Sequence, residues 1–115
     1  SLGGWLMTLA AVARPERVAG LVGVAVALDF VKRLREEIGA EGRVAIERDG
    51  VYRMPSAYGS AGYPITRALL DDGTARCQLD GRIAYRGPVR LLHGQADADV
   101  PWRNSLATAA ALDSD

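Results

Sequence analysis

The chain has 115 residues, and 49% of them are hydrophobic, which is enough for one small domain with a packed core and argues against disorder. Fourteen basic residues balance fourteen acidic ones, so the composition disfavours binding to nucleic acid or to an anionic membrane surface. With Cys77 and His93 as the sole cysteine and histidine, the chain can form neither an internal disulfide nor a zinc site of Cys and His ligands.

The longest unbroken apolar run, Val18–Leu28, is well short of the roughly 20 residues that span a bilayer. The opening residues end in Ala-x-Ala, as secretory signals do, but they lack a charged beginning, so we interpret them as structure. We expect a soluble, cytoplasmic protein with no membrane span, no cofactor and no metal. Neither end has the features of a natural boundary, which predicts a piece of a longer protein.

The first predicted elements are a helix and a strand. Leu2–Ala13 is nearly continuous in apolar and small residues and predicts a buried helix that Pro15 stops. The run Val18–Leu28 shows no alternation of polar and apolar residues, which predicts a central parallel strand covered on both faces. A helix followed by such a strand is typical of α/β layering, and we assign the chain to the α/β class.

The middle of the chain predicts helices and irregular structure. Asp29 is expected to cap a helix that ends at Gly39. Residues 40–62 have weak periodicity and are predicted to be irregular or partly helical. Pro64 at the first helical position and Gly73 just past the last then bracket a second, short helix.

The last part of the chain predicts a strand and a helix that complete the layering. Gly87-Pro88 introduces a compact strand over Val89–Leu92, parallel to the first strand. A final helix starts at Pro101, and both it and the helix from Leu2 are expected to pack against the sheet. The apolar stripe of the final helix consists of Trp102, Leu106, Ala109 and Ala110. The residues expected among the most buried are Leu6, Leu9, Leu21, Val24, Leu91 and Leu106.

Two segments carry residue types suited to acyl transfer. The first is Ser1 followed by Leu2-Gly3-Gly4-Trp5 and an immediate helix, which matches the second half of a G-x-S-x-G turn with Gly3 as its final glycine. The N-terminus of that helix would place its positive dipole end and the Leu2 backbone N–H where an oxyanion develops.

The second segment is HGQADADVP, which begins at His93 directly after the second predicted strand. It supplies an acid, Asp97, in a loop at the carboxyl end of a buried strand, where open α/β sheets place their functional loops. The chain order of a serine followed by an acid is that of the α/β-hydrolases.

The segments SLGGWLM, ARPERVAGLVGVA, GVYRMPS, YPITRALL and PVRLLHGQADADVPW together resemble α/β-hydrolases of the branch that contains palmitoyl-protein thioesterases and acyl-glucuronide esterases. The resemblance covers nearly the whole chain. It implies a partial α/β-hydrolase domain over residues 1–115, the central to later portion of such an enzyme, in which residues 29–87 form a cap insertion over the active site.

The same resemblance assigns roles to individual residues. It makes Ser1 the nucleophile, Asp97 the triad acid and the Leu2 N–H one oxyanion donor. The catalytic histidine of the family lies downstream of the acid, and no histidine follows Asp97 here.

The function that the resemblance implies is hydrolysis of a carboxylic ester or thioester through an acyl-enzyme, without a cofactor. The expected substrate is a small acyl ester or thioester, with an acylated protein as a further candidate. A catalytically inactive truncated fragment and a serine peptidase of the same fold are the alternatives.

Simpler roles compete for the same residues. From its identity alone, Ser1 is better explained as a cap of the first helix, whereas the Gly-Gly-Trp context and the downstream acid loop favour the nucleophile. A third alternative, an N-terminal nucleophile with the chain's own amine as base, is disfavoured by the immediate helix and by the absence of an opening strand. His93 is expected to pack or to hydrogen-bond within its loop, and Cys77 to be a spectator. Asp97 occupies the acid position of H-G-x-x-D-x-x-V-P, whereas Asp99 directly precedes Val100-Pro101 and is expected to cap the final helix.

Overall fold

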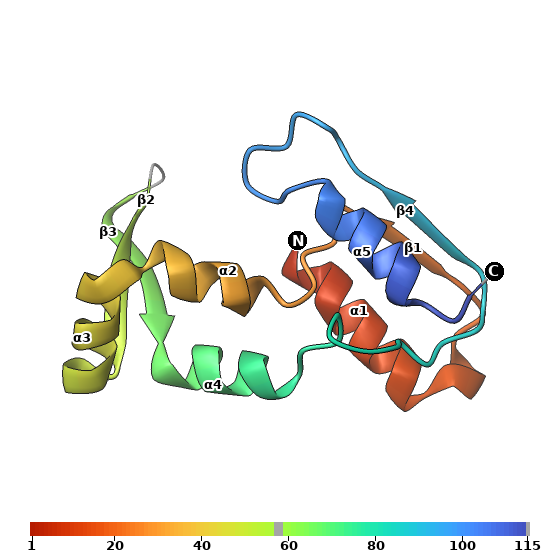
Figure 1. The fold of residues 1–115 in the computed structure, drawn as a ribbon, viewed down its shortest axis with the longest axis horizontal. Helices are drawn as coiled ribbons and strands as arrows, with labels where there is room; N and C mark the ends of the chain where they lie inside the picture. Colours follow the sequence, from red (N-terminus) through yellow and green to blue (C-terminus); the bar gives the residue numbers. More distant parts are fainter. Residues whose placement is uncertain (57–58, 115) are drawn as a thin grey trace. The chain divides into compact units, whose positions relative to one another are not determined.

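The computed structural model describes residues 1–56 and 59–114, and its contacts divide the chain into two compact units (Figure 1). Unit 1 comprises Ser1–Asp29 and Cys77–Asp115, and unit 2 comprises Phe30–Arg76. Residues 57 and 58, which belong to the stretch predicted as irregular, lie outside the described residues.

Unit 1 is built around two parallel strands. Its elements are the helix α1 (Leu2–Ala13), the 3₁₀ turn η1 (Pro15–Arg17), the strands β1 (Leu21–Val24) and β4 (Val89–Leu92), and the helix α5 (Arg103–Ala111). Leu21 pairs with Val89 and Val24 with Leu92 in a parallel register. The predicted first helix, the strand over Val89–Leu92 and the parallel pairing are therefore confirmed.

The first strand is shorter than predicted, and α1 and α5 cover only one face of the pair. On the covered face, a Cβ on Gly23 would lie 3.2 Å from Met7 Cε of α1, and His93, at the end of β4, contacts Ser105 of α5. On the other face, Val22 and Val24 are 68% and 66% exposed. The prediction of a strand covered on both faces is wrong, because both helices pack on the same side.

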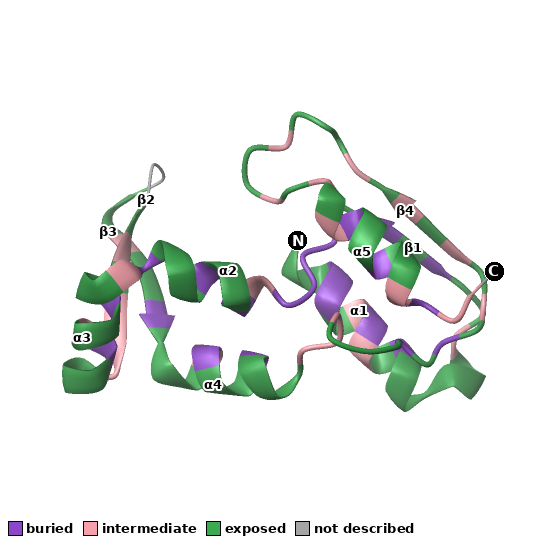
Figure 2. Ribbon diagram, in the orientation of Figure 1, coloured by how far each residue is buried: buried purple, intermediate pink, exposed green. Residues whose placement is uncertain are grey.

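The expected set of most buried residues is only partly right. Leu21 is buried, but Leu6, Val24 and Leu106 are exposed, and Leu9 and Leu91 are intermediate. The core of unit 1 lies instead between α1, the loop after β1 and the segment before β4, as the buried colouring in Figure 2 indicates. Its apolar members are Trp5, Ala11, Leu21, Val26, Ala27, Leu28, Ile83, Tyr85 and Leu112.

The final helix turns its polar side toward the core. It begins at Arg103, two residues later than predicted, and its buried residues are Ser105 and Thr108. The predicted apolar stripe of Trp102, Leu106, Ala109 and Ala110 is partly or fully exposed. Burial of hydroxyl groups on this face is tolerated because each has a partner: Thr108 Oγ1 donates to the Asn104 carbonyl at 2.8 Å, and Ser105 contacts His93.

The described residues of unit 2 form three helices and a pair of antiparallel strands. Its elements are α2 (Phe30–Glu37), α3 (Gly39–Asp49), β2 (Val51–Ser56), β3 (Gly59–Thr66) and α4 (Arg67–Ala75). Gly39 has a φ of 61° and separates α2 from α3, which agrees with the predicted end of the first of these helices. The buried apolar residues of the unit are Val31, Leu34, Ile38, Ile46, Ile65 and Leu70.

One prediction in unit 2 is partly right and another is wrong. Residues 40–62, expected to be irregular or partly helical, do contain the helix α3, but they also contain β2 and half of β3, in which Val51 pairs with Thr66. Pro64 does not start a helix but lies in β3, opposite Arg53. A strand with only one neighbour tolerates proline, which has no N–H to donate. The short helix begins three residues later, where Thr66 Oγ1 accepts the Leu69 N–H at 3.0 Å, and Gly73 lies inside it.

Candidate active site

Ser1 lies at the start of α1, beside the segment that follows β1. Its amino group donates to the Ala25 carbonyl, and its own carbonyl accepts the Ala27 N–H at 3.2 Å. These contacts hold Ser1 at the carboxyl end of β1. The Ser1 hydroxyl makes no hydrogen bond to the first turn of α1, so the alternative of a side-chain cap has no support in the structure.

The Leu2 N–H lies at the start of the first turn of α1, where an N–H has no preceding helical carbonyl to bond, whereas the Gly4 N–H already donates to the Ser1 carbonyl at 3.1 Å. The Leu2 N–H and the helix dipole place a partial positive charge next to Ser1. The first turn contains no acidic residue that would cancel it. An oxyanion that forms beside Ser1 would therefore be stabilised at this end of the helix.

Two glycines allow α1 to approach the end of β1. A Cβ on Gly4 would lie 2.5 Å from Val26 Cγ1, and a Cβ on Gly23 would lie at the same distance from that atom. Val26 is fully buried between them. Only glycine at both positions leaves room for the Val26 side chain, and this close packing positions Ser1 against the loop after β1.

The loop after β1 is buried and held by a residue that the sequence did not single out. Ala25 and Asp29 have φ angles of 49° and 57°, a region that L side chains rarely adopt. Between them, the carbonyls of Val26 and Leu28 accept hydrogen bonds from Asn104 Nδ2 at 2.9 and 3.3 Å. In the sequence, Asn104 stands out only by its spacing: it is a polar residue four positions before Thr108, which places both on one face of the final helix. That face is buried in the structure.

The sequence predicts that Asp29 caps α2, and the structure shows its carboxylate bound to another segment. The carboxylate is buried, and it accepts the N–H groups of Gln78 and Leu79, each at 2.8 Å. Its backbone has a φ of 57°, outside the extended region that is usual for a capping residue. Asp29 joins the two chain segments that leave and re-enter unit 1.

Asp97 lies in the loop after β4 and organises that loop with one of its two oxygens. Its Oδ1 accepts the N–H groups of Asp99 and Val100, each at 2.9 Å. The Val100 and Asp99 N–H groups, helped by His93 and the N-terminal ammonium, hold the pKa of Asp97 below its ordinary value, against the opposing effect of burial. Asp97 is therefore ionised at neutral pH, as a triad acid must be.

His93 is engaged within the same loop, which confirms the hydrogen-bonding role expected for it. Its Nδ1 lies 2.6 Å from Ser105 Oγ, and its Nε2 lies 3.0 Å from the Val100 carbonyl oxygen. Asp99 does not cap α5, because the N-cap residue of this helix is Trp102, and the helix has no side-chain capping hydrogen bond. That prediction is wrong because the chain between Asp99 and the helix continues through Pro101 and Trp102 before the first helical turn.

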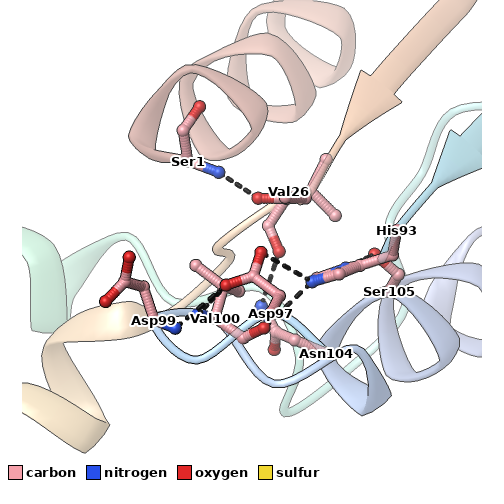
Figure 3. A network of polar contacts seen from close by, with 9 residues as sticks. Ser1, Val26, His93, Asp97, Asp99, Val100, Asn104 and Ser105 are labelled. Carbon is pink, nitrogen blue, oxygen red and sulfur yellow. Dashed lines mark hydrogen bonds and ion pairs between the residues drawn. The ribbon is translucent and has the colours of Figure 1, made fainter. Parts of the chain in front are cut away.

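The structure brings Ser1 and Asp97 to the same end of the strand pair, as Figure 3 shows. Ser1 is fixed beside the end of β1, and Asp97 follows the end of the neighbouring β4. The Ser1 hydroxyl points away from Asp97 in this view. The arrangement supplies a serine, an acid and a helix N-terminus, whereas the imidazole of His93 is bound to Ser105 and Val100.

A hollow of about 460 Å³ lies between β4 and α5, and neither Ser1 nor Asp97 lines it. In residues 1–56 and 59–114, no group of three or more His, Cys, Asp or Glu side chains is arranged to hold a metal ion. No helix in that part of the chain has both the length and the apolar character needed to cross a membrane.

Comparison with known proteins identifies similar sequences and folds, although no family model matches the chain. The palmitoyl-protein thioesterase ABHD10, mitochondrial, of Bos taurus is 44% identical over 110 residues, and that of Homo sapiens is 41% identical over the same length. These matches cover 95% of this chain but only 36% of each relative, so the chain spans about a third of their length.

Two solved structures share the fold. Alpha/beta hydrolase domain-containing protein 10 from mouse matches with a TM-score of 0.83 and 41% identity, over 99% of this chain and 46% of the mouse chain. A putative hydrolase from Agrobacterium vitis S4 matches with a TM-score of 0.87 and 31% identity, over 100% of this chain and 47% of that chain. The predicted partial α/β-hydrolase fold is confirmed.

The comparisons also correct one prediction. The similar proteins of cattle, human and orangutan are named as mitochondrial. The cytoplasmic location predicted from the sequence is therefore wrong. Composition and charge carry no information on this point, because a protein of balanced charge is equally suited to the mitochondrion and the cytoplasm.

Proposed function

We propose that this chain, which has a partial α/β-hydrolase fold, supplies the nucleophile and the acid of a serine hydrolase that cleaves carboxylic esters or thioesters. The observation that carries the proposal is the 41–44% identity, over 95% of the chain, to proteins named palmitoyl-protein thioesterases. The position of Ser1 and Asp97 at one end of the strand pair supports it.

In this proposal Ser1 Oγ attacks the acyl carbonyl and forms an acyl-enzyme. A histidine imidazole removes the Ser1 hydroxyl proton and later passes it to the departing thiolate or alkoxide. The Leu2 N–H and the dipole of α1 stabilise the oxyanion of the tetrahedral intermediate. Water, deprotonated by the same imidazole, then releases the acid and restores Ser1.

Asp97 orients that imidazole and stabilises its protonated form. Its Oδ1 is used by two backbone N–H groups, which leaves Oδ2 to accept the imidazole N–H. His93 is unsuited to be the base, because its two ring nitrogens already contact Ser105 and Val100. The base therefore has to come from outside these 115 residues, whose single histidine is His93.

The proposed substrates are small acyl esters or thioesters, with an acylated protein as a larger candidate. We propose that residues 29–87 form the cap over the acyl site. In support, residues 30–76 within that range form the second compact unit.

The test is a chimera in which this chain replaces the matching 110 residues of the bovine thioesterase, assayed with a chromogenic acyl thioester. Ser1→Ala and Asp97→Asn should nearly abolish hydrolysis, the latter by a factor on the order of 10⁴ in kcat. Asp99→Asn, in the same loop, is the matched control and should stay within a few-fold of the parent chimera. Activity that survives Ser1→Ala refutes the proposed nucleophile, and an inactive Asp99→Asn beside an active Asp97→Asn refutes the proposed acid.

A further inference from the structure

His93 is a buried polar residue for which the proposed chemistry has no direct use. It lies one residue after β4, and its side chain is only 5% exposed. A buried imidazole is tolerated when both of its nitrogens have partners. Here Nδ1 lies 2.6 Å from Ser105 Oγ and Nε2 lies 3.0 Å from the Val100 carbonyl oxygen.

These partners determine which nitrogen carries the proton. A carbonyl oxygen only accepts, so Nε2 must donate its N–H to Val100. In the neutral ring Nδ1 is then the acceptor, and the Ser105 hydroxyl donates to it. The Val100 carbonyl therefore fixes the tautomer, and the Ser105 hydroxyl satisfies the ring nitrogen that carries no proton.

Val100 is the link between His93 and the proposed acid. Its carbonyl accepts from His93, while its N–H donates to Asp97 Oδ1 at 2.9 Å. The other carboxylate oxygen, Oδ2, lies 3.5 Å from His93 Nε2, which is beyond a good hydrogen bond. His93 thus holds the peptide that binds Oδ1 and leaves Oδ2 available to another donor.

We propose that His93 and Ser105 are positioning residues that hold the loop between β4 and α5 in the form in which Asp97 presents Oδ2 to the catalytic imidazole. This inference rests on the proposed function. The chain of contacts runs from Ser105 through His93 and Val100 to Asp97, so each variant along it has a predictable effect.

The first experiment uses the 115-residue chain itself and needs no activity. Amide hydrogen exchange of Asp99 and Val100 reports whether Asp97 Oδ1 remains bound to them. His93→Leu removes both ring contacts and should raise the exchange rates by about tenfold or more, because the Val100 peptide loses its second anchor. His93→Gln places an N–H at a reach similar to that of Nε2 and should restore most of the protection.

Ser105→Ala provides a milder second variant if His93→Leu fails to fold. It keeps the ring but removes the hydroxyl that donates to Nδ1 and anchors the ring, and it should raise the same two exchange rates by a smaller factor. The matched control is Thr108→Val, which removes a hydroxyl from the same buried face of α5 without touching the loop. It should leave the exchange of Asp99 and Val100 unchanged relative to the rest of unit 1.

The second experiment places the same variants in the bovine chimera. A misplaced Asp97 should lower kcat by about 10²-fold in His93→Leu with little change in KM. The acidic limb of the pH–rate profile should shift to lower pH, because the catalytic imidazolium loses its stabilising carboxylate. His93→Gln should recover both quantities, whereas a role in folding alone would lower the yield of folded enzyme and leave the acidic limb in place.

The outcomes separate this inference from the proposed function. If Ser1→Ala and Asp97→Asn abolish hydrolysis while His93→Leu keeps the parental kcat and pH profile, only the positioning role is refuted. Unchanged exchange of Asp99 and Val100 in His93→Leu also refutes it. If Ser1→Ala stays active, the proposed function fails, and the exchange data alone then decide whether His93 organises the loop.

Discussion

Asp97 and Asp99 differ in role although they share a loop and a residue type. The Asp97 side chain is turned back onto the N–H groups of Asp99 and Val100, which forms a local turn and shields part of the carboxylate. Asp99 itself is exposed. The residue type alone does not distinguish the roles of the two acids. The direction of the Asp97 side chain, toward the N–H groups that follow it, does distinguish them.

The lowered pKa of Asp97 predicts a specific pH dependence of stability. A depressed carboxyl pKa contributes stability above the ordinary value, about 4, and this stability is lost as the pH falls through the lower folded value. Asp97→Asn keeps an acceptor oxygen but cannot ionise. The difference in urea midpoint between the parent chain and Asp97→Asn should therefore be largest at neutral pH and shrink toward zero in strong acid.

A difference between the parent chain and Asp97→Asn that stays constant from neutral pH to about pH 2 would show that the charge of Asp97 contributes nothing to the loop.

At the scale of elements, the contact between α1 and the end of β1 depends on a missing side chain. A Cβ on Gly4 would lie 2.5 Å from Val26 Cγ1 and 2.9 Å from the Val26 Cα, so the backbone itself would have to move. Gly4→Ala should therefore destabilise unit 1 by about 1–3 kcal/mol, as overpacking of a core does. Chemical denaturation monitored by Trp5 fluorescence measures this change.

Gly3→Ala is the matched control for Gly4→Ala. Its Cβ would lie 3.6 Å from Ser1 Oγ, an ordinary contact, and alanine is favoured over glycine inside a helix by roughly 1 kcal/mol. Gly3→Ala should leave stability unchanged or raise it. Equal destabilisation by both substitutions would contradict the close packing of α1 against Val26.

The hairpin of unit 2 illustrates why element boundaries escaped prediction. Pro64 and Gly73 match the usual signals for the start and end of a helix, yet β3 extends through Pro64 and the helix starts at the Thr66 cap. The strand is favoured by hydrogen-bonded pairing with residues 51–56, a stabilisation that the single-residue signals of Pro64 and Gly73 do not report. A contact across about 20 positions of the chain, from Arg67 to the Ile46 and Glu47 carbonyls, ties α4 to the end of α3.

For unit 1 as a whole, one face of the strand pair exposes apolar side chains. Val22, Val24 and Leu92 are each more than half exposed. Exposed patches of this kind favour association in water. We predict that the chain self-associates with rising concentration, and that Val22→Thr with Val24→Thr reduces this association in sedimentation velocity.

These two threonines keep the β-branched shape on an exposed face and should change stability by less than about 1 kcal/mol. Leu21→Ala, on the covered face, is the contrast: it should cost about 2–5 kcal/mol and leave the exposed patch intact. Association that is insensitive to the double threonine variant would place the contact elsewhere on the molecule.

A further prediction concerns the catalytic competence of the whole chain. Ser1 has no free imidazole to deprotonate it, because His93 is bound to Ser105 and Val100. A serine hydroxyl is a weak nucleophile without a base. The purified 115-residue chain should therefore hydrolyse activated esters no faster than background, and turnover that Ser1→Ala abolishes would reopen the assignment of His93.

The amino-acid sequence by itself determined the features that rest on local signals. The helix over Leu2–Ala13, the strand over Val89–Leu92 and the fold class follow from continuous apolar runs bounded by Pro and Gly, and the candidates Ser1 and Asp97 follow from short motifs. Only the tertiary structure decided which face of α5 is buried, because Asn104 bonds to Val26 across 78 positions of the chain. The roles of Asp29 and His93 were likewise decided there, since a buried polar group takes whichever partner the folded chain brings near it.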